Sequence, residues 1–344
     1  MIFIHDTGEF VATIPALLGF IPSNSLVLIA TTPTSVGQVH VGPIIRCDLA
    51  TVRIAGTSIV STGLTRLADE PVHDISGFLI GADTSDESPL RDMADEVAEL
   101  LRQSGFRIRH LIHVPELVAG ARWQCYLTAD CRGTLPDPAT TITATASAAA
   151  GYTIAGSREE VAARYTKVSY DARERVRPLI RIAASAAQAD LALSTATRER
   201  IGRTRAAIRC AADGTLPTDD AVIADLIATF STIPFRDVLL SSTAVEQGFG
   251  TEHLALYLWR HCDEPYASHL AAINAVQAYL RGDTVVAMCA LETGNPRVPI
   301  IKLLTSTIRL ALPPSTLREL LDWTHQKTLT VLSGDTNTQE FPGN

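Results

Sequence analysis

A strand–helix–strand pattern between residues 75 and 114 constrains the fold more than any other feature of the chain. Ile75 to Ile80 is a compact apolar run typical of a central strand, and Arg107 to Val114 is a second strand-like stretch. Between them, apolar residues from Leu90 to Leu101 recur on one helical stripe. Such a unit joins two parallel strands through a right-handed crossover, so the sequence predicts a sheet with a parallel pair.

The N-terminal segment predicts a helix followed by a core strand. Apolar residues at helical spacing begin at Phe10, the pattern breaks at Phe20 to Asn24, and Leu26 to Ala30 suits a buried strand. Val36 to Asp48 alternates loosely and should pair with that strand as a hairpin, where Gly42-Pro43 argues for a bulge or an edge strand. Two more elements are expected in this half, a helix over 57–67 and a strand over 122–127.

The character of the chain changes from about Ala139 onward. Ser157 and Glu160 form a capping box for a helix that begins there, and no convincing strand follows. Helical stretches are predicted over residues 139–150, 172–211, 219–230, 235–246, 251–262, 266–281, 283–291, 297–310 and 315–325. Short helices in succession favour antiparallel helix pairs, as in helical-repeat folds, although the sequence has no exact internal period.

These patterns together define the expected fold class. The sequence predicts an α/β N-terminal domain, with a mixed sheet and a β-α-β unit, over residues 1–155. An all-α domain with helical-repeat character follows over residues 156–330, and residues 331–344 are expected to be a frayed tail.

Charge and cysteine usage bound the cellular setting. The 344 residues carry a net charge of −8, which disfavours wholesale binding of nucleic acid or of an anionic membrane. No apolar run reaches the roughly 18–20 residues that span a bilayer, and Met1 to Ala12 lacks the basic start of a secretory leader. The six cysteines are scattered without a CxxC pair, which is typical of reduced thiols. We therefore expect a cytoplasmic protein without a membrane segment.

Residues 158–209 are basic, although the chain as a whole is acidic. Residues 158–209 carry 12 Lys and Arg against 6 Asp and Glu. One helical face would carry Arg198, Arg205 and Arg209. This row of arginines is the only feature of the sequence that could bind nucleic acid. No aromatic residue for base stacking lies between Tyr170 and Phe230. A solvated face or contacts with the chain's own acidic residues are therefore preferred.

Known catalytic and metal-binding motifs do not occur. The chain has no GxxxxGK[ST], GxGxxG or GxSxG sequence. Cys125 and Cys131 are separated by five residues, outside the usual spacing of zinc ligands. His110 and His113 would point to opposite faces of one strand, and no third ligand is evident. We therefore expect no metal and no cofactor.

The candidate ligand-binding residues lie near predicted strand ends. Asp83 stands in an acidic loop between a strand and a helix, where open α/β sheets bind ligands, although its charge would repel phosphate. His113 ends a strand, Asp48 ends another, and Arg122 with Trp123 could present a cation and a flat ring. Packing, surface and solvated-loop roles are the plain alternatives for these residues.

Several stretches resemble the actinobacterial DUF4192 family, whose activity is unknown. The resemblance is carried by Ile14-Pro15-Ala16-Leu17-Leu18-Gly19-Phe20 with Pro22, Ser25, Leu26 and Val27, by Arg122-Trp123-Gln124-Cys125-Tyr126-Leu127 with Gly133 and Pro136, by Ala150-Gly151 with Ser157-Arg158-Glu159, and by Tyr279-Leu280-Arg281-Gly282-Asp283. The chain departs from the family at Thr128, where the resemblance implies a cysteine, and at Asn24, where it implies an acidic residue. The resemblance implies a fold and supplies no function.

The leading functional expectation is a non-enzymatic, cytoplasmic module for protein interaction or assembly. It depends on the missing catalytic motifs, on helix pairs that could present a groove, and on a charge split that suits self-association. The alternative is a small-ligand-binding protein or an enzyme, with a site at the carboxyl ends of strands 75–80 and 107–114. A nucleic-acid-associated protein is the third, weaker reading.

Overall fold

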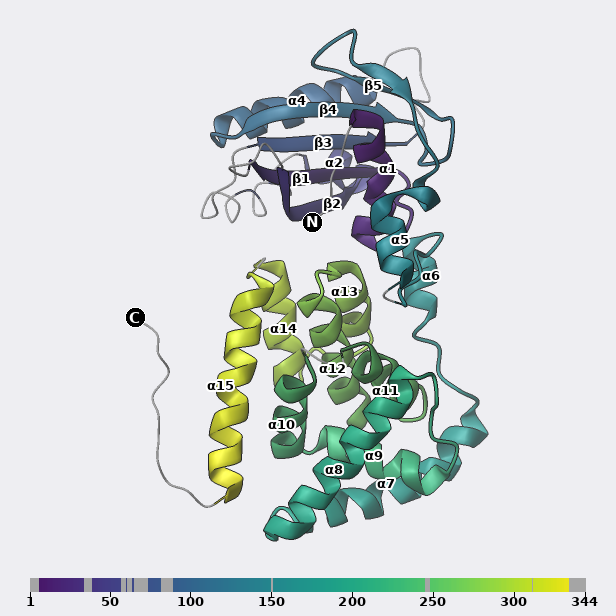
Figure 1. The fold of residues 1–344 in the computed structure, drawn as a ribbon, viewed down its shortest axis with the longest axis vertical. Coiled ribbons are helices and arrows are strands. Elements are labelled where there is room, and N and C mark those ends of the chain that lie inside the picture. The colour runs from purple at the N-terminus through teal and green to yellow at the C-terminus, as the bar shows by residue number, and fades with distance from the viewer. Residues whose placement is uncertain are drawn as a thin grey trace. The chain divides into compact units, whose positions relative to one another are not determined.

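The chain forms two compact units, Met1–Glu160 and Val161–Asn344. Figure 1 shows a computed structural model that describes residues 6–33, 39–56, 60, 64, 74–81, 89–149, 151–244, 248–310 and 312–333. The first unit holds a mixed six-stranded sheet with helices, and the second is a run of helices. The predicted fold class, an α/β part followed by an all-α part, is therefore confirmed.

The N-terminal helix and first strand form as the sequence predicts. Helix α1 (Thr7–Leu18) begins at Asp6, whose side chain accepts a hydrogen bond of 2.7 Å from the Glu9 backbone N–H. It ends at Gly19, whose φ of 75° is a left-handed cap that glycine adopts at no steric cost. Strand β1 (Ser25–Pro33) follows after a short turn. The helix, turn and strand therefore follow from local sequence.

The sheet has the order β2-β1-β3-β4-β5-β6. β2 (Val39–Asp48) pairs antiparallel with β1 at the edge, and β3 (Asp74–Ile80) pairs antiparallel on the other side of β1. Helix α4 (Pro89–Gln103) connects β3 to β4 (Arg107–Val114), and those two strands run parallel. The predicted β-α-β unit and hairpin are thus confirmed, whereas most of the expected helix over 57–67 lies outside the described residues.

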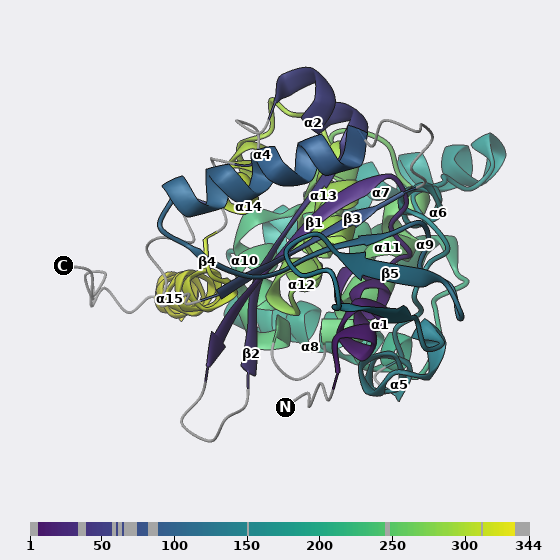
Figure 2. The same cartoon turned by 90° about the horizontal axis from the view of Figure 1, so that it is seen from above.

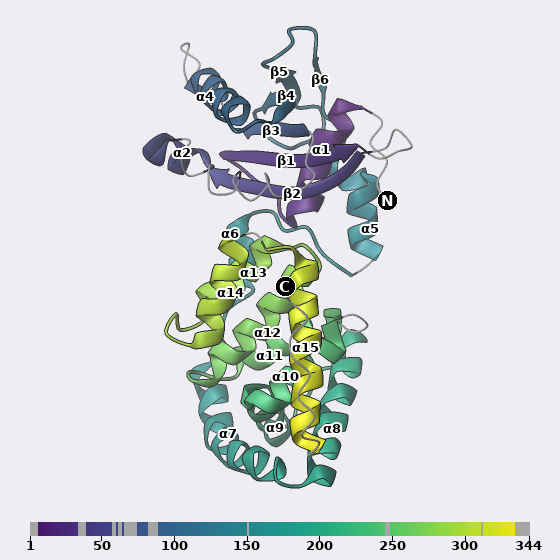
Figure 3. The ribbon, with the colours of Figure 1, turned by 90° about the vertical axis from the view of Figure 1, so that its left-hand side faces the viewer.

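Helices cover both faces of this sheet, as Figures 2 and 3 show. On one face, α2 (Leu49–Ala55) and α4 bury their apolar side chains in one core with alternate residues of β1 and β3. On the other face lies α1, whose Phe10 ring meets Phe78 of β3 edge-on at 5.3 Å. The short strands β5 (Arg122–Cys125) and β6 (Arg132–Thr134) complete the edge beyond β4.

The chain leaves the sheet through short helices. A 3-10 turn η1 (Pro138–Thr140) and helix α5 (Ile142–Ala149) come first. Helix α6 (Arg158–Ala163) begins with the predicted Ser157–Glu160 pair, since the Glu160 N–H donates to Ser157 Oγ at 3.2 Å. In a standard capping box the Glu160 side chain would accept from the Ser157 N–H, whereas here it accepts from the Gly156 N–H at 2.6 Å.

The second unit contains helices α7 to α15. Their bounds are Tyr170–Asp190, Ser194–Ala212, Asp220–Ser231, Ile233–Ala244, Gly248–Arg260, Tyr266–Leu280, Thr284–Glu292, Pro299–Arg309 and Pro314–Ser333. The long stretch predicted over 172–211 divides into α7 and α8 around Leu191, and α15 is longer than expected. Residues 334–344, most of the expected frayed tail, lie outside the described part.

Helix α12 occupies the centre of the second unit. Thirteen of its fifteen residues are buried, and it contacts α9, α10, α11, α13, α14 and α15 (Figure 3). In a solenoid each repeat contacts only its neighbours, whereas here one helix is shared by many. The helical-repeat character expected from the sequence is therefore not established, although the all-α composition is.

Several arginines of the basic segment find partners within their own unit. Arg175 of α7 pairs with Asp220, while Arg177 pairs with Asp263 at 2.9 Å. Arg203 of α8 lies 3.7 Å from Asp225. Part of the charge excess of residues 158–209 is thus offset by later carboxylates, which leaves less of it for an outside partner.

Among the described helices, none has both the length and the apolar character needed to cross a bilayer.

Candidate functional site

The β5–β6 hairpin carries two separate groups of chemically useful side chains, one on each face. Gln124 of β5 pairs with His113 of β4 on one side and with Arg132 of β6 on the other. Arg122 pairs with Thr134 one step along the same hairpin. Because directly paired residues and alternate residues of a strand share a face, these five polar side chains belong to one face of the sheet.

A cavity of about 590 Å³ lies along this polar row. It is lined by His113, Pro115, Arg122, Trp123, Gln124, Arg132, Gly133 and Thr134. Its volume is within the range of small-molecule sites, which is about 300–1,000 Å³. The structure therefore brings together three residues that the sequence singled out, His113, Arg122 and Trp123, and adds Gln124, Arg132 and Thr134 to them.

The charges around the cavity are positive. Arg122 and Arg132 are both exposed, and neither forms an ion pair with any residue that the structure describes. Among the residues that the structure describes, no Asp or Glu lines the cavity, in a chain whose net charge is −8. As diagonal neighbours on the hairpin, the two arginines start about 7–8 Å apart at the backbone. Their long side chains can therefore converge on one anion.

His113 is the only imidazole of the lining set, and its neighbours hold it in place. The ring is buried, with Nε2 2.9 Å from the Gly81 carbonyl oxygen, to which it donates. It also stacks on Tyr126, with ring centroids 6.0 Å apart and planes 13° from parallel. Arg91 of α4 lies over that tyrosine ring at 5.0 Å. The remaining ring nitrogen, Nδ1, is the one available for other contacts.

Trp123 has a packing role in this edge of the sheet. Its side chain is 8% exposed, and its indole lies against the cross-strand partner Gly133. A β-carbon at Gly133 would come within 2.9 Å of Trp123 Cζ2, so only glycine fits beside the ring. The ring thus fixes the hairpin that carries the two arginines.

The other two predicted ligand-binding residues do not join this group. Asp48 ends β2, at the opposite edge of the sheet, and pairs with Arg46 at 2.6 Å. Strands β1, β3 and β4 lie between β2 and β5. With neighbouring strands about 4.8 Å apart, the β2 and β5 backbones are roughly 19 Å apart. Asp83 lies outside the described residues. Of the strand-end residues predicted from the sequence, His113, Arg122 and Trp123 therefore lie at the β4–β6 edge of the sheet.

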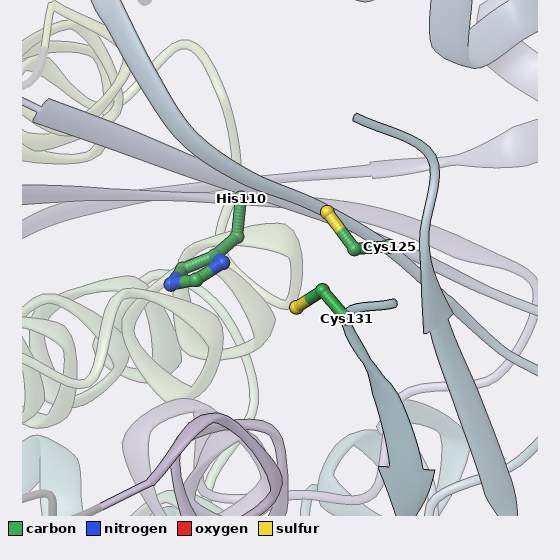
Figure 4. A group of neighbouring side chains, drawn as sticks. All are labelled: His110, Cys125 and Cys131. Atoms are coloured by element: carbon green, nitrogen blue, oxygen red, sulfur yellow. The ribbon is translucent and has the colours of Figure 1, made fainter. Parts of the chain in front are cut away.

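The opposite face of the same hairpin holds His110, Cys125 and Cys131, shown in Figure 4. One ligand atom from each, the two Sγ atoms and a ring nitrogen, lies within 4.8 Å of both others. Cys125 pairs with Ile112, which pairs with Phe78, so this is the face that α1 covers. Cys125 is buried, and the other two are half-buried.

The surroundings of the Cys125 thiol change its acidity. Burial raises its pKa, but hydrogen bonding with the His110 ring and with the backbone at Leu111, Leu127 and Thr128 outweighs burial and lowers the pKa to about 7. For Cys131, burial and the neighbouring Cys125 sulfur raise the pKa. Cys125 is therefore the more acidic thiol of the pair.

Sequence reasoning missed this cluster for an identifiable reason. The five-residue gap between the cysteines is not a metal-binding spacing in a continuous loop, but here it closes a hairpin. The Cys125 N–H donates to the Cys131 carbonyl oxygen at 2.8 Å, and the Cys131 N–H to that of Thr128 at 3.1 Å. The third group, His110, comes from β4 through sheet pairing. No third group beside the cysteines was evident from the sequence, and the structure places His110 there.

Comparison with known proteins gives a single finding about relationship. The family model described as "Domain of unknown function (DUF4192)" matches residues 8–315. No curated protein and no solved structure matches the chain. The match covers both units and includes the motifs that suggested the resemblance. The chain belongs to the DUF4192 family.

Proposed function

We propose that the N-terminal unit binds a small polyanionic ligand in the cavity between Arg122 and Arg132. The observation that carries this proposal is a cavity with two unpaired guanidinium groups among the described residues and no acidic residue in its lining. Arginine presents several N–H donors in a planar fork, which suits phosphate and carboxylate groups. The proposal corresponds to the small-ligand alternative derived from the sequence.

Binding fits the lining better than catalysis does. The lining residues supply one imidazole, and His113 already uses Nε2 on the Gly81 carbonyl oxygen. General acid–base chemistry usually takes two positioned groups of different proton affinity, and the described part of the lining contains no carboxylate to act with the histidine. Gln124 and Thr134 add neutral hydrogen-bonding groups that can orient a ligand.

Calorimetric titration of the full chain with pyrophosphate tests the proposal. We expect saturable binding at one site, and we expect Arg122→Ala and Arg132→Ala each to weaken it about 10- to 100-fold. That range corresponds to about 1.5–3 kcal/mol for one hydrogen bond to a charged group. Arg53→Ala is the matched control, because Arg53 is an exposed arginine of α2 that does not line the cavity.

Two results would count against an anion site. One is the absence of measurable heat with pyrophosphate up to millimolar concentration. The other is binding of equal strength in the Arg122, Arg132 and Arg53 variants, which would mean that the anion binds elsewhere. Circular dichroism of each variant checks that the sheet remains folded.

For the helical unit, we propose self-association, which is one form of the protein-interaction or assembly role that the sequence favoured. The supporting observation is a pair of exposed apolar residues on α15, Leu320 and Val331, which are 38% and 72% exposed. They are eleven residues apart, close to three full turns, so they share one face of the helix. The internal pairing of part of the basic segment weakens the argument from charge complementarity, so this proposal depends mainly on the apolar face.

A further inference from the structure

The cluster on the α1 face of the hairpin points to a function separate from anion binding. Three side chains of the two residue types that bind zinc most often, cysteine and histidine, converge from β4, β5 and the residue before β6 (Figure 4). A tetrahedral zinc ion with Zn–S bonds of about 2.3 Å spaces its sulfur ligands about 3.8 Å apart. The observed limit of 4.8 Å between ligand atoms is close to that spacing.

We propose that His110, Cys125 and Cys131 bind a divalent metal ion of the zinc class. Two thiolates and an imidazole favour zinc and its softer analogues, whereas magnesium and calcium take oxygen ligands. Among the described residues, no fourth His, Cys, Asp or Glu joins the group. In zinc sites with three protein ligands, a water or a bound molecule completes the tetrahedron.

The backbone already holds the two proposed cysteine ligands in place. The bond between the Cys125 N–H and the Cys131 carbonyl oxygen holds the two cysteines opposite each other across the hairpin. The ligands therefore need little rearrangement, which lowers the entropic cost of binding a metal.

The metal would link elements that are only weakly joined in its absence. Strand β5 has two paired positions with β4, through Ile112 with Cys125 and through His113 with Gln124. A metal bound by His110 of β4 and both ends of the hairpin loop would add a strong connection at this edge. We therefore expect metal binding to raise thermal stability as well as to occupy the site.

Metal titration of the reduced full-length protein tests this inference. We expect one equivalent of zinc per chain, and a cobalt derivative with thiolate-to-cobalt charge-transfer absorption and tetrahedral d–d bands. Cys125→Ser and Cys131→Ser should abolish both signals. Loss of a hydrogen bond to a metal ligand costs about 10–100-fold in affinity, so loss of the ligand itself in His110→Ala should weaken zinc binding by more than about 100-fold. The control, Cys210→Ser, changes an exposed cysteine of α8 and should retain the full equivalent.

A second measurement does not depend on any variant. With wild-type protein, zinc should protect Cys125 and Cys131 from iodoacetamide, as read by peptide mass spectrometry, while Cys210 stays reactive. The inference is overturned if the reduced protein takes up no zinc or cobalt, or if the cysteine variants keep the full equivalent. A Cys125–Cys131 disulfide that forms readily in a protein that takes up no metal would identify the pair as a redox couple instead.

Discussion

At the scale of single residues, Gly133 determines how the β5–β6 edge of the sheet is packed. An added methyl group would lie 2.9 Å from Trp123 Cζ2 and 3.1 Å from Cε2. The ring is buried, so it cannot move without displacing its own neighbours. Substitution of Gly133 therefore disturbs the packing of the hairpin without changing Arg122 or Arg132.

We expect Gly133→Ala to lower the free energy of unfolding by about 1–3 kcal/mol, the usual cost of overpacking. Gly202→Ala is the contrasting control, because nothing lies within 4 Å of the added carbon in the middle of α8. There the change should stabilise by about 0.5–1 kcal/mol, since alanine is the better helix former. Urea denaturation measures both effects, and equal midpoints for the two variants would contradict the packing argument.

Glu252 makes stability depend on pH in the helical unit. Burial raises the pKa of this carboxyl to about 7, although Arg281, with which it forms an ion pair, opposes the shift and Asp283 adds to it. Because its pKa is raised in the folded state, the native protein binds the extra proton between about pH 4.3 and 7. The stabilisation from the protonated form is complete at low pH and is lost as the pH rises through 7.

We therefore expect wild-type protein to lose on the order of 3 kcal/mol between pH 5 and 8 relative to Glu252→Gln. Glutamine keeps an oxygen that can accept from Arg281 but cannot ionise. Urea midpoints at the two pH values, compared between wild type and variant, give the difference directly. Parallel pH profiles would show that Glu252 ionises in the folded state as it does in the unfolded one.

At the scale of elements, a buried arginine connects three helices. The Arg200 side chain of α8 is 3% exposed and contacts Asp190 of α7 at 2.7 Å and Asp225 of α9 at 2.5 Å. It also donates to Thr229 Oγ1 at 2.9 Å and lies over the Phe235 ring. Removing one partner of such a group leaves the other charges without compensation.

We expect Arg200→Ala to cost about 3–5 kcal/mol in free energy of unfolding. Arg198→Ala on the same helix is the matched control, because Arg198 is exposed and its change should stay within about 0.5 kcal/mol. Chemical denaturation followed by helical circular dichroism measures both. If Arg200→Ala costs no more than Arg198→Ala, the two carboxylates do not depend on this arginine.

At the scale of the whole molecule, self-association through α15 predicts a concentration-dependent mass. Light scattering on the full chain should give a molar mass above that of one chain, rising with concentration. Leu320→Glu combined with Val331→Glu should return it to the monomer value, because charges at an apolar contact oppose association. Ile54→Glu is the control, since Ile54 is 88% exposed but belongs to the N-terminal unit. A monomer at all concentrations would remove this proposal.

Local sequence alone determined most of the elements. The apolar runs of β1 and β3 and the amphipathic stripe of α4 depend on neighbouring residues, so they could be recognised without coordinates. The order of the α/β and helical parts and the resemblance to the family could also be recognised from the sequence alone.

The tertiary structure decided the rest. The register between β4, β5 and β6 places Arg122, Gln124 and Arg132 on one face and Cys125 and Cys131 on the other. Such register depends on contacts between residues far apart in the chain, and no local pattern specifies which distant side chains will meet.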